Sequence, residues 1–186
     1  MGLLERERVV LVCVDAQPGF LDKGDSSQAL ERMTWVAAIA ARLGIPIVVT
    51  EEEPERHGTT HPRIAAQLPA GTPVFTKPTF GLAGTPEILA AVRETGRSSA
   101  LLIGCETDVC VAQSAIGLQG AGLACVVVDD ATFSPGEMHE RGLARLASAG
   151  VERNHAKGVT YELLRTVEDA HAVLGAADLP DAPFQL

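Results

Sequence analysis

Aromatic residues and positive charge are both scarce in this chain. Phe, Trp and Tyr make up 4% of its 186 residues, so Val, Leu, Ile and Ala must supply the core. The 24 acidic residues outnumber the 15 Lys and Arg, giving a formal net charge of -9 without any basic run. A nucleic-acid-binding protein needs basic residues to neutralise phosphates, so we expect no nucleic-acid partner. The acidic balance weakly favours a neutral or cationic small molecule as the substrate.

Long hydrophobic runs are absent as well. Asp15, Glu106 and Asp129 interrupt the most apolar stretches, so none reaches the length of a membrane span. The N-terminal segment MGLLERERVV lacks the apolar core of a signal peptide. Arg6 stands where N-myristoylation requires Ser or Thr. We therefore expect a cytoplasmic protein with no membrane partner.

The cysteines follow no metal-binding or redox spacing. Of the four, Cys13, Cys105 and Cys125 lie in apolar runs typical of strands, where a free thiol behaves as a small hydrophobic group. Cys110 lies outside such a run. The G-x-S-x-G motif of serine hydrolases is missing. No G-x-G-x-x-G follows the first apolar run, so a nucleotide-binding Rossmann domain is a poor interpretation.

Apolar runs alternate with amphipathic segments along the chain. Most of the runs are continuous, as in parallel strands that are covered on both faces. We predict strands at 9–15, 45–51, 72–77, 99–105, 123–130 and, from a weaker pattern, 150–154. We predict helices at 26–44, 85–96, 107–122, 136–150 and 159–175, several of which end at glycine. This alternation predicts an α/β fold of three layers with a doubly wound, mainly parallel sheet.

No repeat or linker divides the chain, so we expect a single domain over residues 1–186 with its core at about 9–170. The Pro-containing tail, 176–186, is expected either to fray or to pack on a neighbour, with fraying favoured.

Residues with reactive side chains follow several of the predicted strands. Asp15 follows the first, the run 51–53 of three Glu the second, Lys77 the third, and Cys110 comes shortly after the fourth. In open α/β sheets, ligands bind outside the carboxyl ends of the strands, near the point where the strand order reverses. We therefore expect an acid, a cation and a thiol on one edge of the sheet.

These side chains could form a nucleophilic site. Thr107 and Asp108 are good N-cap types, which would place Cys110 in the first turn of a helix, where the dipole favours a thiolate. The Lys77 ammonium would favour the same thiolate, and Asp15 could act as a general base. Each residue also has a structural interpretation, as a buried small residue, a solvated charge or a turn cap. The residues alone leave both interpretations open.

Three segments together resemble the isochorismatase-like cysteine hydrolase superfamily. VDAQPGF (14–20) is similar to its D-x-Q-x-x-F motif, and FTKPTFGLAGT (75–85) to its K-x-x-[FS]-x-F segment. GCETDVCVAQSAIGLQGAG (104–122) with VVVDDATFS (126–134) is similar to its block around G-x-x-T-x-x-C-V. The matches occur in the expected order across roughly residues 9–165, so they are specific as a set.

The resemblance implies a six-stranded parallel sheet flanked by helices and a triad of Asp15, Lys77 and Cys110. It also implies a non-proline cis peptide between Cys105 and Glu106. The backbone N–H groups of Glu106 and Cys110 would then form an oxyanion hole. The implied reaction is attack of the Cys110 thiolate on an amide-like carbonyl, followed by hydrolysis of the thioester with Asp15 as base.

The resemblance has further implications for the pocket and the assembly. Gln17, Phe20 and Phe80 would form walls of the substrate pocket. Members of the superfamily commonly form dimers or larger rings, which implies a homo-oligomer.

The segment TEEEPERHGTTHPRI (50–64) departs from the nicotinamidases of this superfamily. It lacks their Asp-x-His motif, which holds a divalent metal. His57 and His61 have the spacing of ligands on one helical face, but Gly58 and Pro62 argue against a helix there. We therefore expect a solvated acidic loop, no metal and no cofactor.

The same segment looks most like short isochorismatase-domain proteins of poorly defined substrate. Retention of Cys110 favours hydrolysis at a C–N bond of a small amide or ureide. Two alternatives stay open: hydrolysis of a vinyl ether, as in true isochorismatases, and a non-catalytic binding module on the same scaffold.

Overall fold

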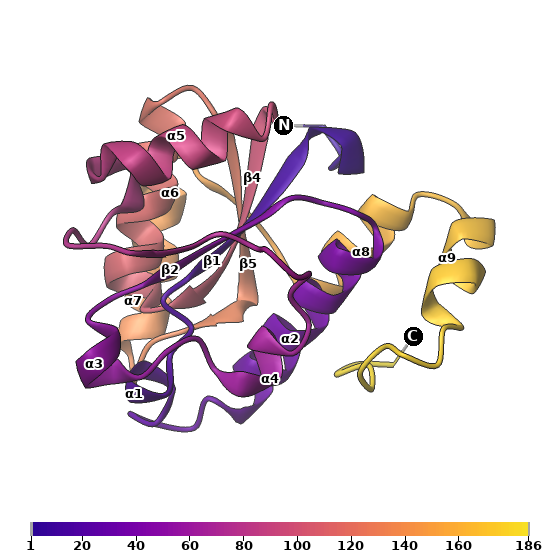
Figure 1. Cartoon of the computed structure of the whole chain (residues 1–186), viewed down its shortest axis with the longest axis horizontal. Helices are drawn as coiled ribbons and strands as arrows, with labels where there is room; N and C mark the ends of the chain where they lie inside the picture. Colours follow the sequence, from indigo (N-terminus) through magenta and orange to yellow (C-terminus); the bar gives the residue numbers. More distant parts are fainter. Residues whose placement is uncertain (1, 186) are drawn as a thin grey trace.

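Six parallel strands form one sheet in the computed structural model of this chain, which describes residues 2–185. Their order is β3-β2-β1-β4-β5-β6, and every neighbouring pair is parallel. Figure 1 labels the four central strands. The strands are β1 (Val9–Val14), β2 (Ile47–Glu51), β3 (Val74–Thr76), β4 (Ser99–Cys105), β5 (Ala124–Phe133) and β6 (Glu152–Asn154). The predicted doubly wound α/β fold is confirmed, and the sheet is parallel throughout rather than only in the main.

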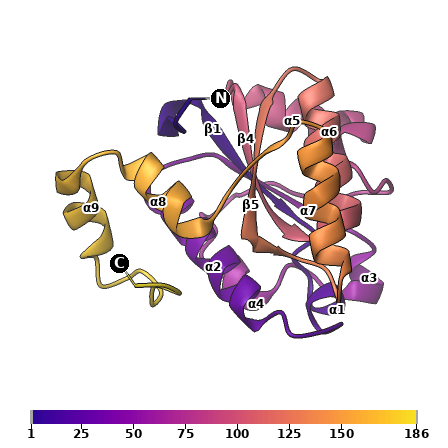
Figure 2. The same cartoon turned by 180° about the vertical axis from the view of Figure 1, so that it is seen from behind.

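Helices cover both faces of the sheet (Figures 1 and 2). One face packs against α2 (Ser27–Arg42), α4 (Pro62–Ala65) and α8 (Ala156–Leu164). The other packs against α5 (Pro86–Glu94), α6 (Ala112–Gly120) and α7 (Met138–Ser148). The remaining helical segments are η1 (Arg6–Arg8), α1 (Pro18–Leu21), α3 (Pro54–His57), η2 (Leu82–Gly84), η3 (Thr107–Val111) and α9 (Val167–Leu174).

The central position of β1 in the sheet explains why its sequence is apolar at every residue instead of alternating. All six of its residues are buried. Val9, Leu11 and Cys13 face the core under α2 and α8, whereas the residues between them face the core under α5, α6 and α7. A strand covered on both faces must be apolar at every position. Trp35 of α2 is buried, as expected for a residue in an Ala-rich helix, and its indole N–H donates to Thr160 at 2.9 Å.

The last predicted helix, 159–175, was wrong as a single element. It is two helices, α8 and α9, separated at Arg165, whose φ of +66° is incompatible with a continuing α-helix. Thr166 then caps α9, because its side chain accepts from the Asp169 N–H at 3.0 Å. A Thr followed three residues later by Asp, as in TVED, is the local sequence signal for this new helix start.

The segment after β2 contains more structure than the predicted loop. Two four-residue helices, α3 and α4, each begin at a proline, and Gly58 with a φ of +79° ends the first. The prediction that Gly58 and Pro62 prevent one continuous helix is consistent with this arrangement.

The C-terminal tail packs on its own domain rather than fraying. The Phe184 ring meets Trp35 edge to face at a centroid distance of 5.6 Å. Asp178 pairs with Arg42 of α2 at 2.9 Å. Leu186, the last residue of the predicted tail, lies outside the described residues. The tail is the yellow segment that returns toward α2 in Figure 1.

Among residues 2–185, no helix combines the length and the apolar character needed to cross a bilayer.

Candidate active site

The candidate residues meet because the strand ends are in register. Val14 of β1 lies beside Thr50 of β2 and beside Gly104 of β4, and Glu51 of β2 lies beside Thr76 of β3. The residues that follow these strands therefore share one edge of the sheet. The strand order reverses between β1 and β4, so this edge includes the switch point at which ligands bind in such sheets.

Asp15 and Lys77 form an ion pair with no solvent exposure. The Lys77 Nζ lies 2.6 Å from Oδ2 of Asp15, and both side chains are fully buried. The Thr50 hydroxyl donates to the other carboxylate oxygen, Oδ1, at 2.8 Å. Asp15 has a φ of +46°, which turns the chain away at the end of β1 while its side chain stays at the sheet edge.

Cys110, which lies in the segment that follows β4, completes this cluster. The Lys77 ammonium donates to its Sγ at 3.4 Å and to the Thr79 carbonyl oxygen at 3.0 Å. A carboxylate oxygen of Asp15 also lies within 4.8 Å of the Cys110 Sγ. The structure thus brings together Asp15, Lys77 and Cys110, although Asp15 and Cys110 stand 95 positions apart in the sequence.

The turn that carries Cys110 is a π-helix, η3, which leads directly into α6. Its N-cap residue is Glu106, so Thr107 and Asp108 do not cap it as expected. They anchor the turn instead. Thr107 Oγ1 lies 2.9 Å from His139 Nδ1 of α7, and the Ser134 hydroxyl donates to Asp108 Oδ1 at 2.6 Å.

Two glycines make the close packing around this turn possible. A Cβ at Gly104 would lie 1.8 Å from the Val14 carbonyl oxygen, so only glycine lets β4 pass the end of β1 here. A Cβ at Gly142 of α7 would lie 2.6 Å from the Asp108 backbone nitrogen. Glycine at these positions lets β1 and α7 approach the segment that carries Cys110. The peptide bond between Cys105 and Glu106 is cis, as the sequence resemblance implies.

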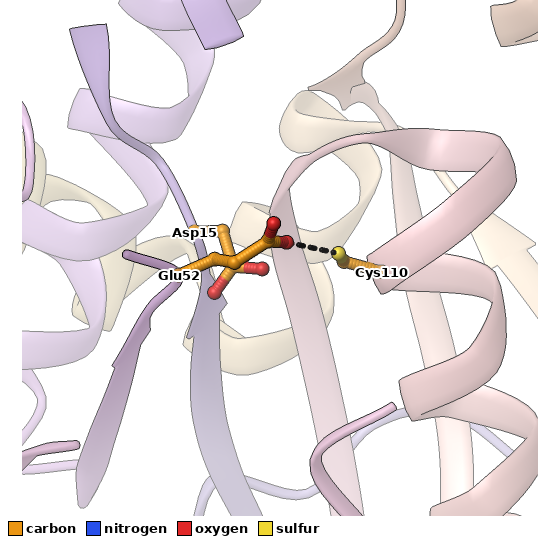
Figure 3. Close-up of side chains that lie close together, drawn as sticks. All are labelled: Asp15, Glu52 and Cys110. Atoms are coloured by element: carbon orange, nitrogen blue, oxygen red, sulfur yellow. Dashed lines mark hydrogen bonds between the residues drawn. The ribbon is translucent and has the colours of Figure 1, made fainter. Parts of the chain in front are cut away.

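Glu52 is a neighbour of the thiol that the sequence prediction missed. The Cys110 Sγ donates toward Glu52 Oε2 at 3.4 Å, and the same oxygen lies 3.9 Å from the Lys77 Nζ. Figure 3 shows the Glu52 and Asp15 carboxylates together on one side of the thiol, with the Glu52 contact dashed. The run of three Glu that begins at the last residue of β2 signalled an acidic edge, but strand periodicity alone could not tell which of them faces the cysteine.

Burial dominates the electrostatics of the thiol. It raises the pKa of Cys110, the negative charge of Asp15 raises it further, and the Lys77 ammonium lowers it. The net effect is a raised pKa of Cys110. The thiol is therefore favoured at rest, whereas the sequence led us to expect a thiolate. Burial also raises the pKa of Asp15, against the opposing effect of Lys77. The raised pKa favours a neutral Cys110 thiol, and the 2.6 Å contact beside it is that of a carboxylate–ammonium pair.

The remaining predicted residues occupy different places around the cluster. Gln17 is buried and binds backbone, accepting from the Glu52 N–H at 2.7 Å and donating to the Glu52 carbonyl at 3.0 Å. Phe20 is buried and stacks on His57. Phe80 is 55% exposed and lines an open cavity of about 660 Å³ together with Glu52 and Lys77.

Glu106 lies beside the cluster. Among the contacts within residues 2–185, none joins its side chain to the Cys110 thiol. Its side chain is half-buried, and its Oε1 pairs with the Lys23 ammonium at 2.9 Å. The same ammonium lies 4.6 Å from the centre of the Phe20 ring. Lys23 is therefore a second cation at this edge, and its charge is already matched by Glu106.

Two groups of potential metal ligands occur in the part of the chain that the structure describes. One is Asp15, Glu52 and Cys110, and the other is Glu52, Glu53 and His57. In the first group the Lys77 ammonium already neutralises Asp15, so a divalent cation would meet a positive charge. His61 belongs to neither group. It is the N-cap residue of α4, where its Nδ1 accepts from the Arg63 N–H, whereas His57 lies in α3. The two histidines therefore do not share a helical face.

Comparison with known proteins places this site within a described family. The profile of the isochorismatase domain matches residues 9–154. Isochorismatase domain-containing protein 1 from Danio rerio is 34% identical over 174 residues, covering 90% of this chain and 59% of that protein. The chain thus spans less than two thirds of that relative's length.

Solved structures share the fold over nearly the whole chain. The ycaC gene product of Escherichia coli, an octameric hydrolase of unknown specificity, matches with a TM-score of 0.88 at 24% identity, over 94% of this chain and 88% of that one. YcaC from Pseudomonas aeruginosa, solved with hexane-2,5-diol and covalent acrylamide, matches with a TM-score of 0.83 at 26% identity, over 93% and 90%. Because the family profile covers most of the residues, including all six strands and the cluster at their ends, the chain belongs to the isochorismatase domain family.

Proposed function

We propose that this protein is a cysteine hydrolase that cleaves a C–N bond in a small amide or ureide. The observation that carries the proposal is the Lys77 ammonium, which contacts both the Asp15 carboxylate and the Cys110 sulfur in a buried cluster beside an open cavity. A nucleophile, a base and a cation that orients both are the parts that acyl transfer through a thioester requires.

The reaction begins from the neutral thiol. Asp15 removes the proton from Cys110 as Sγ attacks the substrate carbonyl carbon. Burial makes the carboxylate more basic but also makes the thiol less acidic, so the proton leaves together with the attack rather than before it. The tetrahedral intermediate collapses as the C–N bond breaks, and Asp15 returns the proton to the leaving nitrogen. Ammonia or an amine departs and a thioester remains. Water, deprotonated by Asp15, then attacks the thioester, releases the carboxylic acid and regenerates the thiol.

The Lys77 ammonium has two roles in this scheme. It stays beside Asp15 and stabilises the thiolate as the proton leaves Sγ, since it donates to that sulfur at 3.4 Å. It also fixes the orientation of both groups through its third contact, the carbonyl of Thr79. Holding the reacting groups in position lowers the entropic part of the barrier.

We propose the backbone N–H groups of Glu106 and Cys110 as the oxyanion hole. The first i→i−5 hydrogen bond of η3 runs from the Val111 N–H to the Glu106 carbonyl oxygen. The Cys110 N–H belongs to the residue just before this donor. Amides in the first turn of a helix lack intrahelical acceptors and can point at a developing negative charge.

The open cavity beside Lys77 would receive the substrate. Phe80 and Thr79 line it, and Phe80 offers an exposed ring that could cover an apolar part of the ligand. Gln17 and Phe20, which were expected as pocket walls, would act less directly, by fixing the backbone at Glu52 and by packing on His57.

Two properties of the solved relatives support the proposal. YcaC from P. aeruginosa holds covalent acrylamide, an electrophile that thiols attack at its C=C bond, so this comparison supports a nucleophilic site rather than a particular amide substrate. We expect acrylamide to label Cys110 in this protein as well. The E. coli protein is described as an octamer, and we propose that this chain also forms a homo-oligomer, a dimer or larger.

The test is ammonia or amine release from a panel of small amides and ureides, for wild type and Cys110→Ala. Loss of all release in the variant supports the thioester route. Pyruvate release from a vinyl ether that persists in Cys110→Ala would instead support chemistry of the isochorismatase type. Ligand binding without any turnover would support a binding module.

A further inference from the structure

We propose that Glu52 determines substrate specificity at this site. Its carboxylate accepts an N–H from an uncharged or cationic amide, and it repels substrates that carry a carboxylate next to the reacting carbonyl. This inference rests on the proposed cysteine hydrolase function and narrows its substrate class.

Glu52 is the acid of the cluster that faces the cavity. Its side chain is 20% exposed, whereas Asp15 and Lys77 have no exposure. It lines the cavity together with Lys77 and Phe80. Its Oε2 lies 3.4 Å from the Cys110 Sγ. A carbonyl carbon attacked by Sγ, and the groups one bond further out, must therefore come within reach of this carboxylate.

The position of Glu52 is fixed by a buried side chain. Gln17 accepts from the Glu52 backbone N–H at 2.7 Å and donates to its carbonyl oxygen at 3.0 Å. A second donation from the same amide goes to the Gly58 carbonyl, which ties the far end of the loop to this point. With its backbone held on both sides, Glu52 presents its carboxylate to the cavity in a defined place. A preorganised acceptor discriminates between substrates better than a mobile one.

The charges that line the site do not cancel. The carboxylates of Asp15 and Glu52 face one ammonium, that of Lys77, so the cluster carries a net charge of -1 when the thiol is neutral. Arg56 lines the same cavity, but it is exposed and pairs with Glu53 at 3.3 Å. A substrate carboxylate placed beside Glu52 would be repelled, whereas an amide N–H or an ammonium would be attracted. This preference disfavours dicarboxylate substrates at this site.

The inference is tested by alkylating Cys110 with two reagents of nearly equal size, neutral iodoacetamide and anionic iodoacetate. Rates at Cys110 are followed by peptide mass spectrometry at low ionic strength, and each is divided by the rate with glutathione. The quantity compared is the ratio of the two normalised rates. The ratio is needed because Glu52 also affects thiolate formation, which changes both rates together.

The variants are Glu52→Gln, which keeps the shape of the side chain, and Glu55→Gln as a matched control. Glu55 is an exposed residue of α3 in the same loop, and it does not face the thiol. Replacing it with Gln removes the same charge as Glu52→Gln. We expect wild type to favour iodoacetamide, and Glu52→Gln to reduce this preference at least about fivefold, the factor for two unit charges 4 Å apart in water. Glu55→Gln should leave it unchanged. Fluorescence of Trp35 verifies that the variants are folded.

Each other outcome overturns the inference in a distinguishable way. An unchanged ratio in Glu52→Gln refutes the specificity role and leaves the cysteine hydrolase proposal intact. An equal fall in both variants assigns the effect to the general charge of the loop. If neither reagent labels Cys110 in any variant up to pH 9, the thiol is not a nucleophile, and the proposed function fails together with this inference.

Discussion

Replacing Lys77 with methionine removes the ammonium that pairs with the buried Asp15 carboxylate. Methionine is similar in length and apolar, so it fills the site that the lysine stem leaves. Asp15 keeps its hydrogen bond from Thr50 but loses the cation 2.6 Å away. The variant therefore isolates the contribution of the buried charge from that of packing.

Breaking a buried ion pair by removing one partner costs about 3–5 kcal/mol, because an uncompensated charge remains. We expect Lys77→Met to lose about this much of its free energy of unfolding at pH 7. The loss should shrink at lower pH. Without Lys77, the pKa of Asp15 rises further above its already raised value, since the cation opposes the effect of burial. A raised carboxyl pKa costs no stability below its unfolded value, and the cost grows as the pH rises toward the folded pKa.

Urea unfolding of wild type and variant between pH 4 and pH 8, followed by Trp35 fluorescence, measures this difference. At pH values between the pKa of Asp15 in folded wild type and its pKa in the folded variant, the loss of unfolding free energy should increase by about 1.4 kcal/mol per pH unit. The double variant Asp15→Asn with Lys77→Met is the control, because it leaves no buried charge. We expect it to recover most of the stability.

Two results would refute the reasoning. A loss below about 1 kcal/mol at pH 7, with no dependence on pH, would mean that Asp15 is not an ionised partner of Lys77. A double variant no more stable than the single one would assign the loss to packing.

Three further predictions concern the thiols, the sheet edge and the last helix. Burial raises the pKa of Cys13 to about 12 and that of Cys110 well above its ordinary value. Iodoacetamide labelling of Cys110 should therefore still be accelerating at pH 9, and Cys13 should react only in urea; a plateau for Cys110 below pH 8 would contradict this. Gly104→Ala should lose at least about 3 kcal/mol or fail to fold, because its Cβ would meet a carbonyl oxygen of β1 at 1.8 Å; a melting temperature like that of wild type would disprove the close contact. Thr166→Ala should cost about 1 kcal/mol and increase hydrogen exchange in α9 alone; protection that stays unchanged there would argue against the cap.

Much of the fold could be predicted from periodicity. Continuous apolar runs of strand length, separated by amphipathic helices, are compatible with few architectures other than a parallel sheet covered on both faces. Helix ends were less predictable. The division between α8 and α9 depends on Arg165 adopting a positive φ, which a helical pattern on both sides conceals.

The tail shows the same limit. Its composition is typical of a chain end that frays, yet Phe184 has an aromatic partner in Trp35 of α2. A contact between residues so distant in sequence leaves no periodic signal.

The sequence by itself determined which residue types stand at the ends of the strands: Asp15, Lys77 and the turn that carries Cys110. Strand register then brings them together, because parallel strands end at the same edge. Only the tertiary structure decided their electrostatic state. The high pKa of Cys110 comes from burial and from Asp15, and both depend on the surroundings rather than on the local motif. The position of Glu52 was decided in the same way, since which of three adjacent acids faces the thiol depends on how Gln17 holds the loop.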